Sequence, residues 1–175
     1  MATFAAAFTV QQSADCTTLT FTDTSNYTTN DQSYTTASFD DRVFKVYNSE
    51  EQLVATLTMT GTDLNVTYTL TQDQWLSVEL DLTLDGNTTP DFTVTHSVLS
   101  TCFLKLCFSE LMAESECGCG CSGGSCGCAD STCNDTVRIL QYIKAAEIFA
   151  EYSNEQLAQK QLDAGTALCE ANHNK

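Results

Sequence analysis

Six cysteines within one short glycine-rich segment are the residues of this chain best suited to chemistry. The segment, residues 116–134, reads ECGCGCSGGSCGCADSTCN. Its cysteines are Cys117, Cys119, Cys121, Cys126, Cys128 and Cys133. Thiolates are soft ligands that suit Zn²⁺ or Cu(I), so a structural metal site, with Zn²⁺ as the first candidate, is one interpretation. Free or variably oxidised thiols in a loop, or structural disulfides, are the alternatives, and the number of cysteines does not choose among the three.

The spacing of these cysteines is C-x-C, which is less specific for a metal than paired C-x2-C motifs. It resembles the spacing found in metallothioneins. The other four cysteines, Cys16, Cys102, Cys107 and Cys169, stand apart from the cluster. Each of them is expected to be a small buried hydrophobe rather than a ligand, because free cysteine is among the most buried residue types.

Residues typical of catalysis are sparse. The two histidines, His96 and His173, belong to no recognisable nucleophile–base motif, and the chain has no GxSxG, HExxH or Walker pattern. His96 is interpreted as a polar residue at the end of a strand. We therefore expect no enzymatic activity, no catalytic residues and no organic cofactor.

Four aspartates surround a long polar stretch between two expected strands. Asp23, Asp31, Asp40 and Asp41 could hold a hard cation such as Ca²⁺, although their spacing matches no EF-hand. The alternative is a solvated acidic loop.

The charge balance limits the partners of the chain. The formal net charge is -16, and the first hundred residues contain only two basic side chains, Arg42 and Lys45. Nucleic-acid binding needs clustered basic side chains, and an anionic membrane surface attracts them, so neither partner is expected.

The N-terminal MATFAAAFTV lacks the positive region of a secretory signal, and no apolar run reaches the roughly 20 residues of a membrane helix. We expect the protein to stay in the cytosol or to leave by cell lysis.

Apolar residues alternate with threonine through the first ninety-odd residues, which predicts β-strands. Strands are expected within residues 4–10, 19–21, 43–46, 53–59, 64–70, 76–84 and 92–94. Asp85-Gly86-Asn87 is a strong signal for a tight turn, because glycine tolerates a positive φ. Seven short antiparallel strands with regular turns predict an immunoglobulin-like (Ig-like) β-sandwich over residues 1–96.

The pattern changes after about residue 96, and the chain is predicted to be α+β. A connecting helix is expected over 97–115, the Cys/Gly-rich segment over 116–134, and a helical hairpin over 135–171. Asp135 is expected to cap the first hairpin helix. Ser153 with Gln156 has the spacing of a capping box for the second.

Two stretches and the cysteine cluster are similar to a known group of proteins. The stretches are FTVQQSADCTTLTFTDTSNYTTND and TYTLTQDQWLSVELDLTLDGNTTPDFTV. Together with the Cys-Gly cluster, they resemble small virion proteins of crAss-like podoviruses of Bacteroidales. The resemblance implies a structural component of the phage neck or tail, such as a ring protein near the portal. It implies a homo-oligomer whose partners are the portal, a tail adaptor or neighbouring rings, and which assembles in the host cytoplasm.

Two other functions stay open. The first is an Ig-like binding module or adhesin that contacts a glycan or receptor through the loop around Tyr27 and Tyr34, since tyrosine is favoured at interfaces. The second is a metal-binding protein that uses the cysteines from Cys117 to Cys133.

Overall fold

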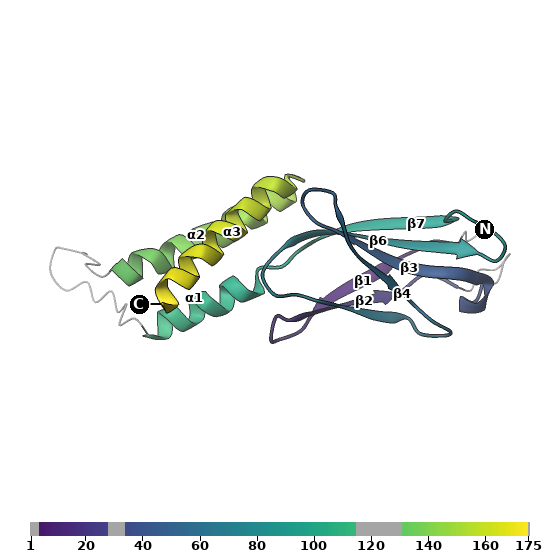
Figure 1. Cartoon of the computed structure of the whole chain (residues 1–175), viewed down its shortest axis with the longest axis horizontal. Helices are drawn as coiled ribbons and strands as arrows, with labels where there is room; N and C mark the ends of the chain where they lie inside the picture. The colour runs from purple at the N-terminus through teal and green to yellow at the C-terminus, as the bar shows by residue number, and fades with distance from the viewer. Residues whose placement is uncertain (1–3, 28–33, 115–130, 175) are drawn as a thin grey trace. The chain divides into compact units, whose positions relative to one another are not determined.

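Seven strands form two antiparallel sheets in the N-terminal part of the chain, followed by three helices (Figure 1). This is seen in a computed structural model that describes residues 4–27, 34–114 and 131–174. The chain divides into two compact units. The sandwich unit comprises Met1–Thr71 and Leu76–Val98, and the helical unit comprises Gln72–Trp75 and Leu99–Lys175. The α+β prediction is confirmed at this level.

Each sheet is built from strands that are distant in the sequence. The strands are β1 (Phe8–Gln12), β2 (Thr18–Asp23), β3 (Phe39–Tyr47), β4 (Leu53–Thr58), β5 (Asn65–Thr69), β6 (Trp75–Leu84) and β7 (Phe92–Leu99). One sheet has the order β1-β2-β5 and the other β4-β3-β6-β7. Phe21 pairs with Val10 on one side and Val66 on the other, and Phe44 pairs with Leu80. These registers place apolar side chains opposite one another on one face of each sheet.

The inward faces of the two sheets form the core of the sandwich unit. Leu19 and Phe21 of β2 are fully buried, and the threonines that alternate with them are partly exposed, as a period of two requires. The ring of Phe44 in β3 lies 5.2 Å from that of Phe8 and 5.4 Å from that of Phe21, both in the other sheet. Aromatic contacts at these distances join the two layers.

Several strand ends differ from the expected residues, whereas the predicted turn is present. β7, for example, continues to Leu99, past the expected end at residue 94. β1 begins at Phe8 rather than near Phe4. At the predicted turn, Gly86 has a φ of 84°, and the Asn87 N–H donates to the Leu84 carbonyl at 3.0 Å. The turn prediction is confirmed, because this backbone conformation is one that glycine adopts without strain.

Three helices pack together in the helical unit: α1 (Cys102–Glu114), α2 (Ser131–Glu151) and α3 (Glu155–His173). Their shared core consists of Leu104, Cys107, Leu111, Ile139, Ile143, Ala146 and Leu162. At Gly165 a Cβ would lie 3.0 Å from Leu104 Cδ1. The absence of a side chain at Gly165 therefore lets α3 approach α1 closely.

The helix ends differ from the expected boundaries. A connecting helix was expected over 97–115, and α1 instead forms part of the shared helical core. The Cys/Gly-rich segment was expected to reach residue 134, but α2 already begins at Ser131. Asp135 therefore lies inside α2 rather than capping it, so the predicted cap is wrong. Its carboxylate accepts a hydrogen bond from Asn172 Nδ2 of α3 at 3.2 Å.

The predicted capping box of the last helix is also wrong. The N-cap of α3 is Asn154, whose side-chain oxygen accepts from the Leu157 N–H at 3.3 Å. Ser153 stands one residue earlier with a φ of 53°, in the turn between α2 and α3. Serine and asparagine are both good N-caps, and the tight turn decides which of them occupies that position.

Among the helices over residues 102–114 and 131–173, none contains an apolar stretch long enough to span a lipid bilayer.

Candidate functional site

The predicted metal-binding cysteines lie almost entirely outside the described residues. Cys117, Cys119, Cys121, Cys126 and Cys128 belong to residues 115–130, and Cys133 is known only by its backbone position in α2. A zinc site made by these residues stays a prediction.

The aspartates predicted as possible calcium ligands have different partners. Asp31 lies outside the described residues, and Asp41 is exposed. Asp40 accepts a hydrogen bond from the Gly86 N–H at 2.8 Å, which holds the β6–β7 turn. Asp23 is buried beside Arg42. Asp23 and Asp40 therefore hold loops in place.

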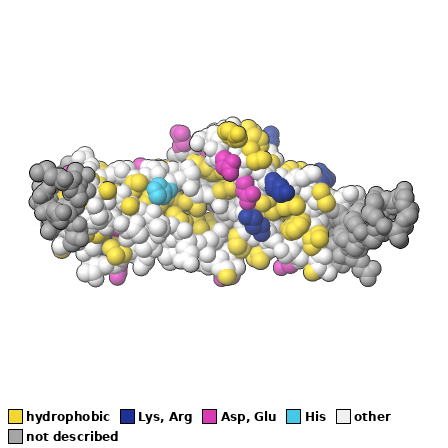
Figure 2. All heavy atoms as spheres, turned by 180° about the vertical axis from the view of Figure 1, so that it is seen from behind, with side chains coloured by type: hydrophobic (Ala, Val, Ile, Leu, Met, Phe, Trp, Pro, Cys, Tyr) yellow, Lys and Arg dark blue, Asp and Glu magenta, His cyan; other side chains and the backbone are white. Residues whose placement is uncertain are grey.

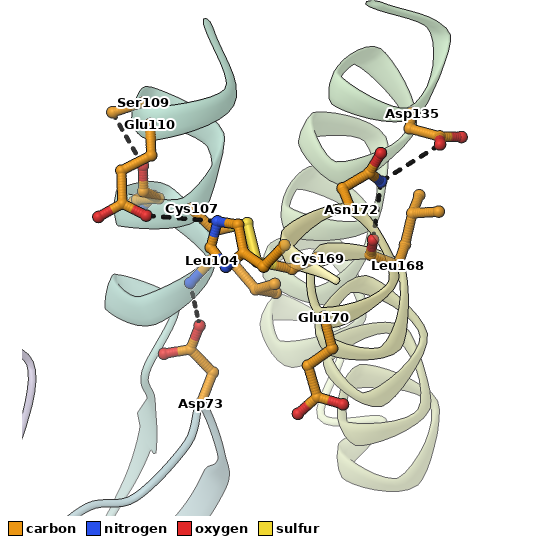
Figure 3. The surroundings of a disulfide bond; sticks show 12 residues. Asp73, Leu104, Cys107, Ser109, Glu110, Asp135, Leu168, Cys169, Glu170 and Asn172 are labelled. Carbon is orange, nitrogen blue, oxygen red and sulfur yellow. Dashed lines mark hydrogen bonds and ion pairs between the residues drawn. A yellow bond between two sulfur atoms is a disulfide. The ribbon is translucent and has the colours of Figure 1, made fainter. Parts of the chain in front are cut away.

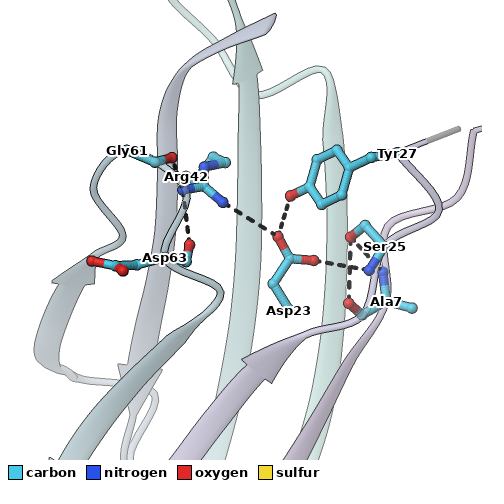
Figure 4. Close-up of polar contacts among 7 residues, drawn as sticks. All are labelled: Ala7, Asp23, Ser25, Tyr27, Arg42, Gly61 and Asp63. Atoms are coloured by element: carbon cyan, nitrogen blue, oxygen red, sulfur yellow. Dashed lines mark hydrogen bonds and ion pairs between the residues drawn. The ribbon is translucent and has the colours of Figure 1, made fainter. Parts of the chain in front are cut away.

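Asp23 and Arg42 form a buried charged cluster in the sandwich unit (Figure 4). One carboxylate oxygen of Asp23 accepts from the Tyr27 hydroxyl and lies 4.0 Å from Arg42 Nη1. Its other oxygen accepts from the Ser25 N–H at 2.9 Å. The side chains of Arg42 and Asp23 are 3% and 0% exposed, so each charge depends on the other for neutralisation.

The same arginine holds the loop between β4 and β5. Arg42 Nη2 donates to the carbonyl oxygens of Gly61 at 2.8 Å and of Asp63 at 2.9 Å. Burial raises the pKa of Tyr27 well above its ordinary value, and the hydrogen bond to Asp23 raises it further. The Tyr27 hydroxyl is thus kept as a neutral donor, and the cluster stabilises loops.

Tyr27 and Tyr34, predicted as contact residues for a partner, pack within an aromatic cluster. Phe4 lies between them, with its ring 5.8 Å from that of Tyr27 and 5.2 Å from that of Tyr34. Phe92 of β7 is 4.4 Å from Phe4, and Phe39 of β3 is 5.6 Å from it. Both tyrosine side chains are therefore engaged in this packing.

An open hollow of about 420 Å³ lies beside this cluster on the sandwich unit. It is lined by the short 3-10 helix Thr36–Ser38, the start of β3 and the end of β4 with the turn after it. Asp40 and Arg42 contribute to a lining that is otherwise mostly uncharged. Arg42 already binds Gly61 and Asp63, so its charge is not free to bind a ligand there.

A second charged cluster links three neighbouring strands. Lys45 Nζ donates to Asp81 Oδ2 at 2.5 Å and lies 3.6 Å from Glu79 Oε1. The other oxygen of Asp81 accepts from Thr93 Oγ1 at 2.7 Å. The hydrogen bond to Asp81 raises the pKa of Lys45, so the ammonium stays charged well above neutral pH. The interpretation of His96 as a strand-end residue is wrong, because it lies inside β7, which continues to Leu99. Its ring stacks on that of Phe8 with centroids 4.3 Å apart.

In the helical unit, sequence reasoning missed a disulfide (Figure 3). Cys107 of α1 is bonded to Cys169 of α3, with their Cα atoms 6.3 Å apart. Cys16 and Cys102 are disulfide-bonded as well, so the expectation that these four cysteines are simple buried hydrophobes is wrong. Beside them, His173 Nε2 lies 3.5 Å from Glu110 Oε2. The two cysteines are separated by 62 residues, and only the packing of α1 against α3 reveals that they meet.

A buried carboxylate at the start of α1 was also missed. Asp73 precedes β6, yet it belongs to the helical unit. Its oxygens accept from Ser100 Oγ at 2.7 Å, the Phe103 N–H at 3.1 Å and the Leu104 N–H at 2.8 Å. Asp73 therefore acts as an N-cap supplied by a distant segment, and its negative charge suits the N-terminus of a helix.

The buried polar side chains described above bind one another and hold loops and helix ends. Comparison with known proteins adds no family: no protein-family model matches the chain, and none of the curated proteins is similar enough to count as a relative.

Proposed function

We propose that this protein is a structural component of a phage virion, a ring subunit of the neck or tail near the portal. The resemblance to virion proteins of crAss-like podoviruses motivates this function. The order of the strands supports an Ig-like sandwich. The sheets β1-β2-β5 and β4-β3-β6-β7 correspond to seven Ig-like strands in which the fourth joins the second sheet. Ig-like sandwiches serve many unrelated functions, so support for a virion function has to come from the exposed side chains.

The observation that carries the proposal is an exposed apolar strand at a sheet edge. β4 is the outer strand of its sheet, and its side chains Leu53 and Val54 are 53% and 45% exposed. A sheet edge presents unpaired backbone groups, and an apolar edge readily pairs with another chain. We infer that β4 contacts a neighbouring copy or a neighbouring ring protein.

The helical unit carries a second exposed apolar pair. Ile148 of α2 and Tyr152, the first residue after this helix, are 52% and 80% exposed. The two are close together, because the Tyr152 N–H donates to the Ile148 carbonyl at 3.2 Å. On the face drawn in Figure 2, apolar side chains lie beside charged ones over the helices, and most of the sandwich surface is uncharged. Each unit thus offers its own contact surface, which suits a subunit that touches more than one neighbour.

The ring itself would be held by repetition. A head-to-tail interface closes into a ring when its rotation allows, and many copies of a modest contact give a stable assembly. The partners proposed are other copies of this chain and the portal, tail adaptor or neighbouring rings. The net charge of -16 favours these partners over nucleic acid.

Peptide mass spectrometry on purified particles tests the proposal. In a crAss-like phage carrying this gene, we expect the protein at a near-stoichiometric ratio to the portal. Clean particles that lack it, with abundant protein left in the lysate, would overturn the virion function and favour a binding module.

A second experiment tests the β4 surface. Val54→Lys places a charge on the exposed edge and should lower the amount of protein incorporated into particles or rings. Thr9→Lys is the matched control, because Thr9 is also an exposed position on an outer strand, in the other sheet. Equal incorporation of both variants would show that β4 makes no contact.

A further inference from the structure

Three side chains with metal-binding chemistry meet between α1 and α3, and a fourth, Glu110, lies beside one of them. Cys107 and Glu110 are three residues apart on α1, and Cys169 and His173 are four residues apart on α3. Both spacings place the two side chains on one face of a helix. The sulfur atoms of both cysteines and a ring nitrogen of His173 all lie within 4.8 Å of one another. Glu110 lies next to this group, because its Oε2 is 3.5 Å from His173 Nε2.

In the disulfide form, this group has no thiolate to offer. Each sulfur is bonded to the other, so only His173 and Glu110 could bind a cation. Reduction would convert the pair into two thiols at the same place. Two thiolates, one imidazole and one carboxylate form a mixed set of four ligands that suits tetrahedral Zn²⁺.

We propose that the reduced protein binds one Zn²⁺ ion through Cys107, Cys169, His173 and Glu110, and that formation of the Cys107–Cys169 disulfide closes this site. The site is distinct from the cluster between Cys117 and Cys133. It does not depend on the function proposed above.

The distances among the two sulfurs and the imidazole nitrogen fit such a site after small side-chain rotations, and Glu110 completes it from its place beside His173. With Zn–S bonds of about 2.3 Å, two thiolates of a tetrahedral site stand about 3.8 Å apart. The sulfurs must therefore move apart from bonding distance, whereas the imidazole nitrogen is already within 4.8 Å of them. Cys107 is only 4% exposed, and the side chains of His173 and Glu110 are 45% and 62% exposed. The buried sulfur is thus shielded, while the exposed ligands give the ion a route from solvent.

The chemical steps balance with a thiol as reductant. Two thiol molecules transfer two electrons and two protons to the disulfide. The sulfur–sulfur bond of Cys107–Cys169 breaks, two cysteine thiols form, and the reductant becomes a disulfide. Zn²⁺ then binds both sulfurs and displaces their two protons to solvent. Oxidation of the two thiolates by a small disulfide reverses the exchange and releases the ion.

The test uses the full chain without the six cysteines of the glycine-rich segment. The background variant carries serine in place of Cys117, Cys119, Cys121, Cys126, Cys128 and Cys133. Co²⁺ replaces Zn²⁺ as a spectroscopic probe, because its thiolate charge-transfer and tetrahedral ligand-field bands report the ligands. We expect about one equivalent bound by the reduced background protein and none by the oxidised one, and we expect Zn²⁺ to displace the Co²⁺.

Variants of the four proposed ligands test whether Co²⁺ binds at this site. Cys107→Ser and Cys169→Ser should each remove the thiolate bands expected of the pair. His173→Gln and Glu110→Gln leave the disulfide intact, and each should weaken Co²⁺ binding by at least about tenfold, the cost of losing even an outer-shell partner. His96→Gln, which changes the only other histidine, is the matched control and should bind as the background does.

Two results would overturn the proposal. One is a reduced background protein, helical by circular dichroism, that binds no Co²⁺ with thiolate bands. The other is binding that stays at full affinity in both His173→Gln and Glu110→Gln, which would place the ion elsewhere.

Discussion

Replacing Asp73 with alanine should destabilise the helical unit strongly. The carboxylate is 1% exposed and accepts three hydrogen bonds, from Ser100 Oγ, the Phe103 N–H and the Leu104 N–H. Alanine removes the acceptor of all three hydrogen bonds, and it leaves the Phe103 and Leu104 N–H groups unpaired in a site too buried for free access of water. An unsatisfied buried donor costs about 1–3 kcal/mol, and loss of an N-cap costs about 0.5–2 kcal/mol. Because these contributions overlap, we expect a loss of about 3–5 kcal/mol in the free energy of unfolding.

Urea unfolding followed by two probes of the helical unit measures this loss. Trp75, the only tryptophan of the chain, is 7% exposed, and its backbone N–H donates to Gln159 Oε1 of α3 at 2.9 Å. Its fluorescence and the helical circular dichroism should therefore shift to lower urea together. Asp73→Asn keeps the shape of the side chain but turns one acceptor into a donor, so we expect a smaller loss of about 1–2 kcal/mol.

The control is Asp163→Ala on α3, an exposed aspartate that accepts one hydrogen bond from Gln159 Nε2 at 2.8 Å. Surface changes of this kind usually stay within about 0.5 kcal/mol. If Asp73→Ala were no more destabilising than Asp163→Ala, the hydrogen bonds of Asp73 would not stabilise the start of α1.

Three further changes test the packing and charge arguments. Arg42→Met leaves the Asp23 carboxylate buried without its partner and should cost about 3–5 kcal/mol, measured as a lower unfolding temperature of the sandwich unit by calorimetry. Tyr27→Phe removes a hydrogen bond to a charged group and should cost about 1.5–3 kcal/mol at neutral pH. The difference in stability between the native protein and this variant should narrow above pH about 10. Gly165→Val forces a side chain against Leu104 and should cost about 1–3 kcal/mol, measured by urea unfolding of the helices.

The narrowing gap for Tyr27→Phe follows from the direction of its pKa. The folded state raises the pKa of Tyr27 above its ordinary value of 10.0. Above that ordinary value, the unfolded tyrosine loses its proton while the folded one keeps it. The native protein therefore loses stability as pH rises, by at most about 1.4 kcal/mol per pH unit from this group, and the phenylalanine variant does not. Lys45 also has a raised pKa, but it contributes equally to both proteins and cancels in the difference.

A specific result would contradict each of these three predictions. A difference between the native protein and Tyr27→Phe that stays constant from pH 8 to about pH 11 would mean that the tyrosine titrates normally in the folded state. An Arg42→Met variant as stable as the native protein would show that Asp23 is not left uncompensated. A Gly165→Val variant with unchanged stability would show that α1 and α3 can separate at this point.

Features set by neighbouring residues were predictable from the sequence. The alternation of threonine with Leu19 and Phe21 predicted β2, because the side chains of a strand point to opposite faces in turn. Asp85-Gly86 predicted the turn where Gly86 takes a positive φ. The spacing of apolar residues after about residue 100 predicted a helix where α1 lies. A few adjacent residues suffice for each of these inferences.

The sites that hold the protein together depend on residues that are far apart in the chain. Nothing near Asp73 indicates that it caps a helix beginning about thirty residues later, and nothing near Cys107 indicates Cys169 as its partner. The same holds for Arg42 with the carbonyls of Gly61 and Asp63.

By itself, the sequence determined the fold class, the approximate positions of the strands and helices, and an acidic surface, because periodicity and charge are properties of local segments and of composition. The tertiary structure decided which polar and sulfur-containing side chains meet, because those contacts arise only when sheets and helices pack. The ring of Phe44 reaches Phe8 and Phe21 across two sheets, and Glu110 reaches His173 across two helices. Such short distances between side chains cannot be read from the order of residues along the chain. They result from the packing of apolar faces against one another.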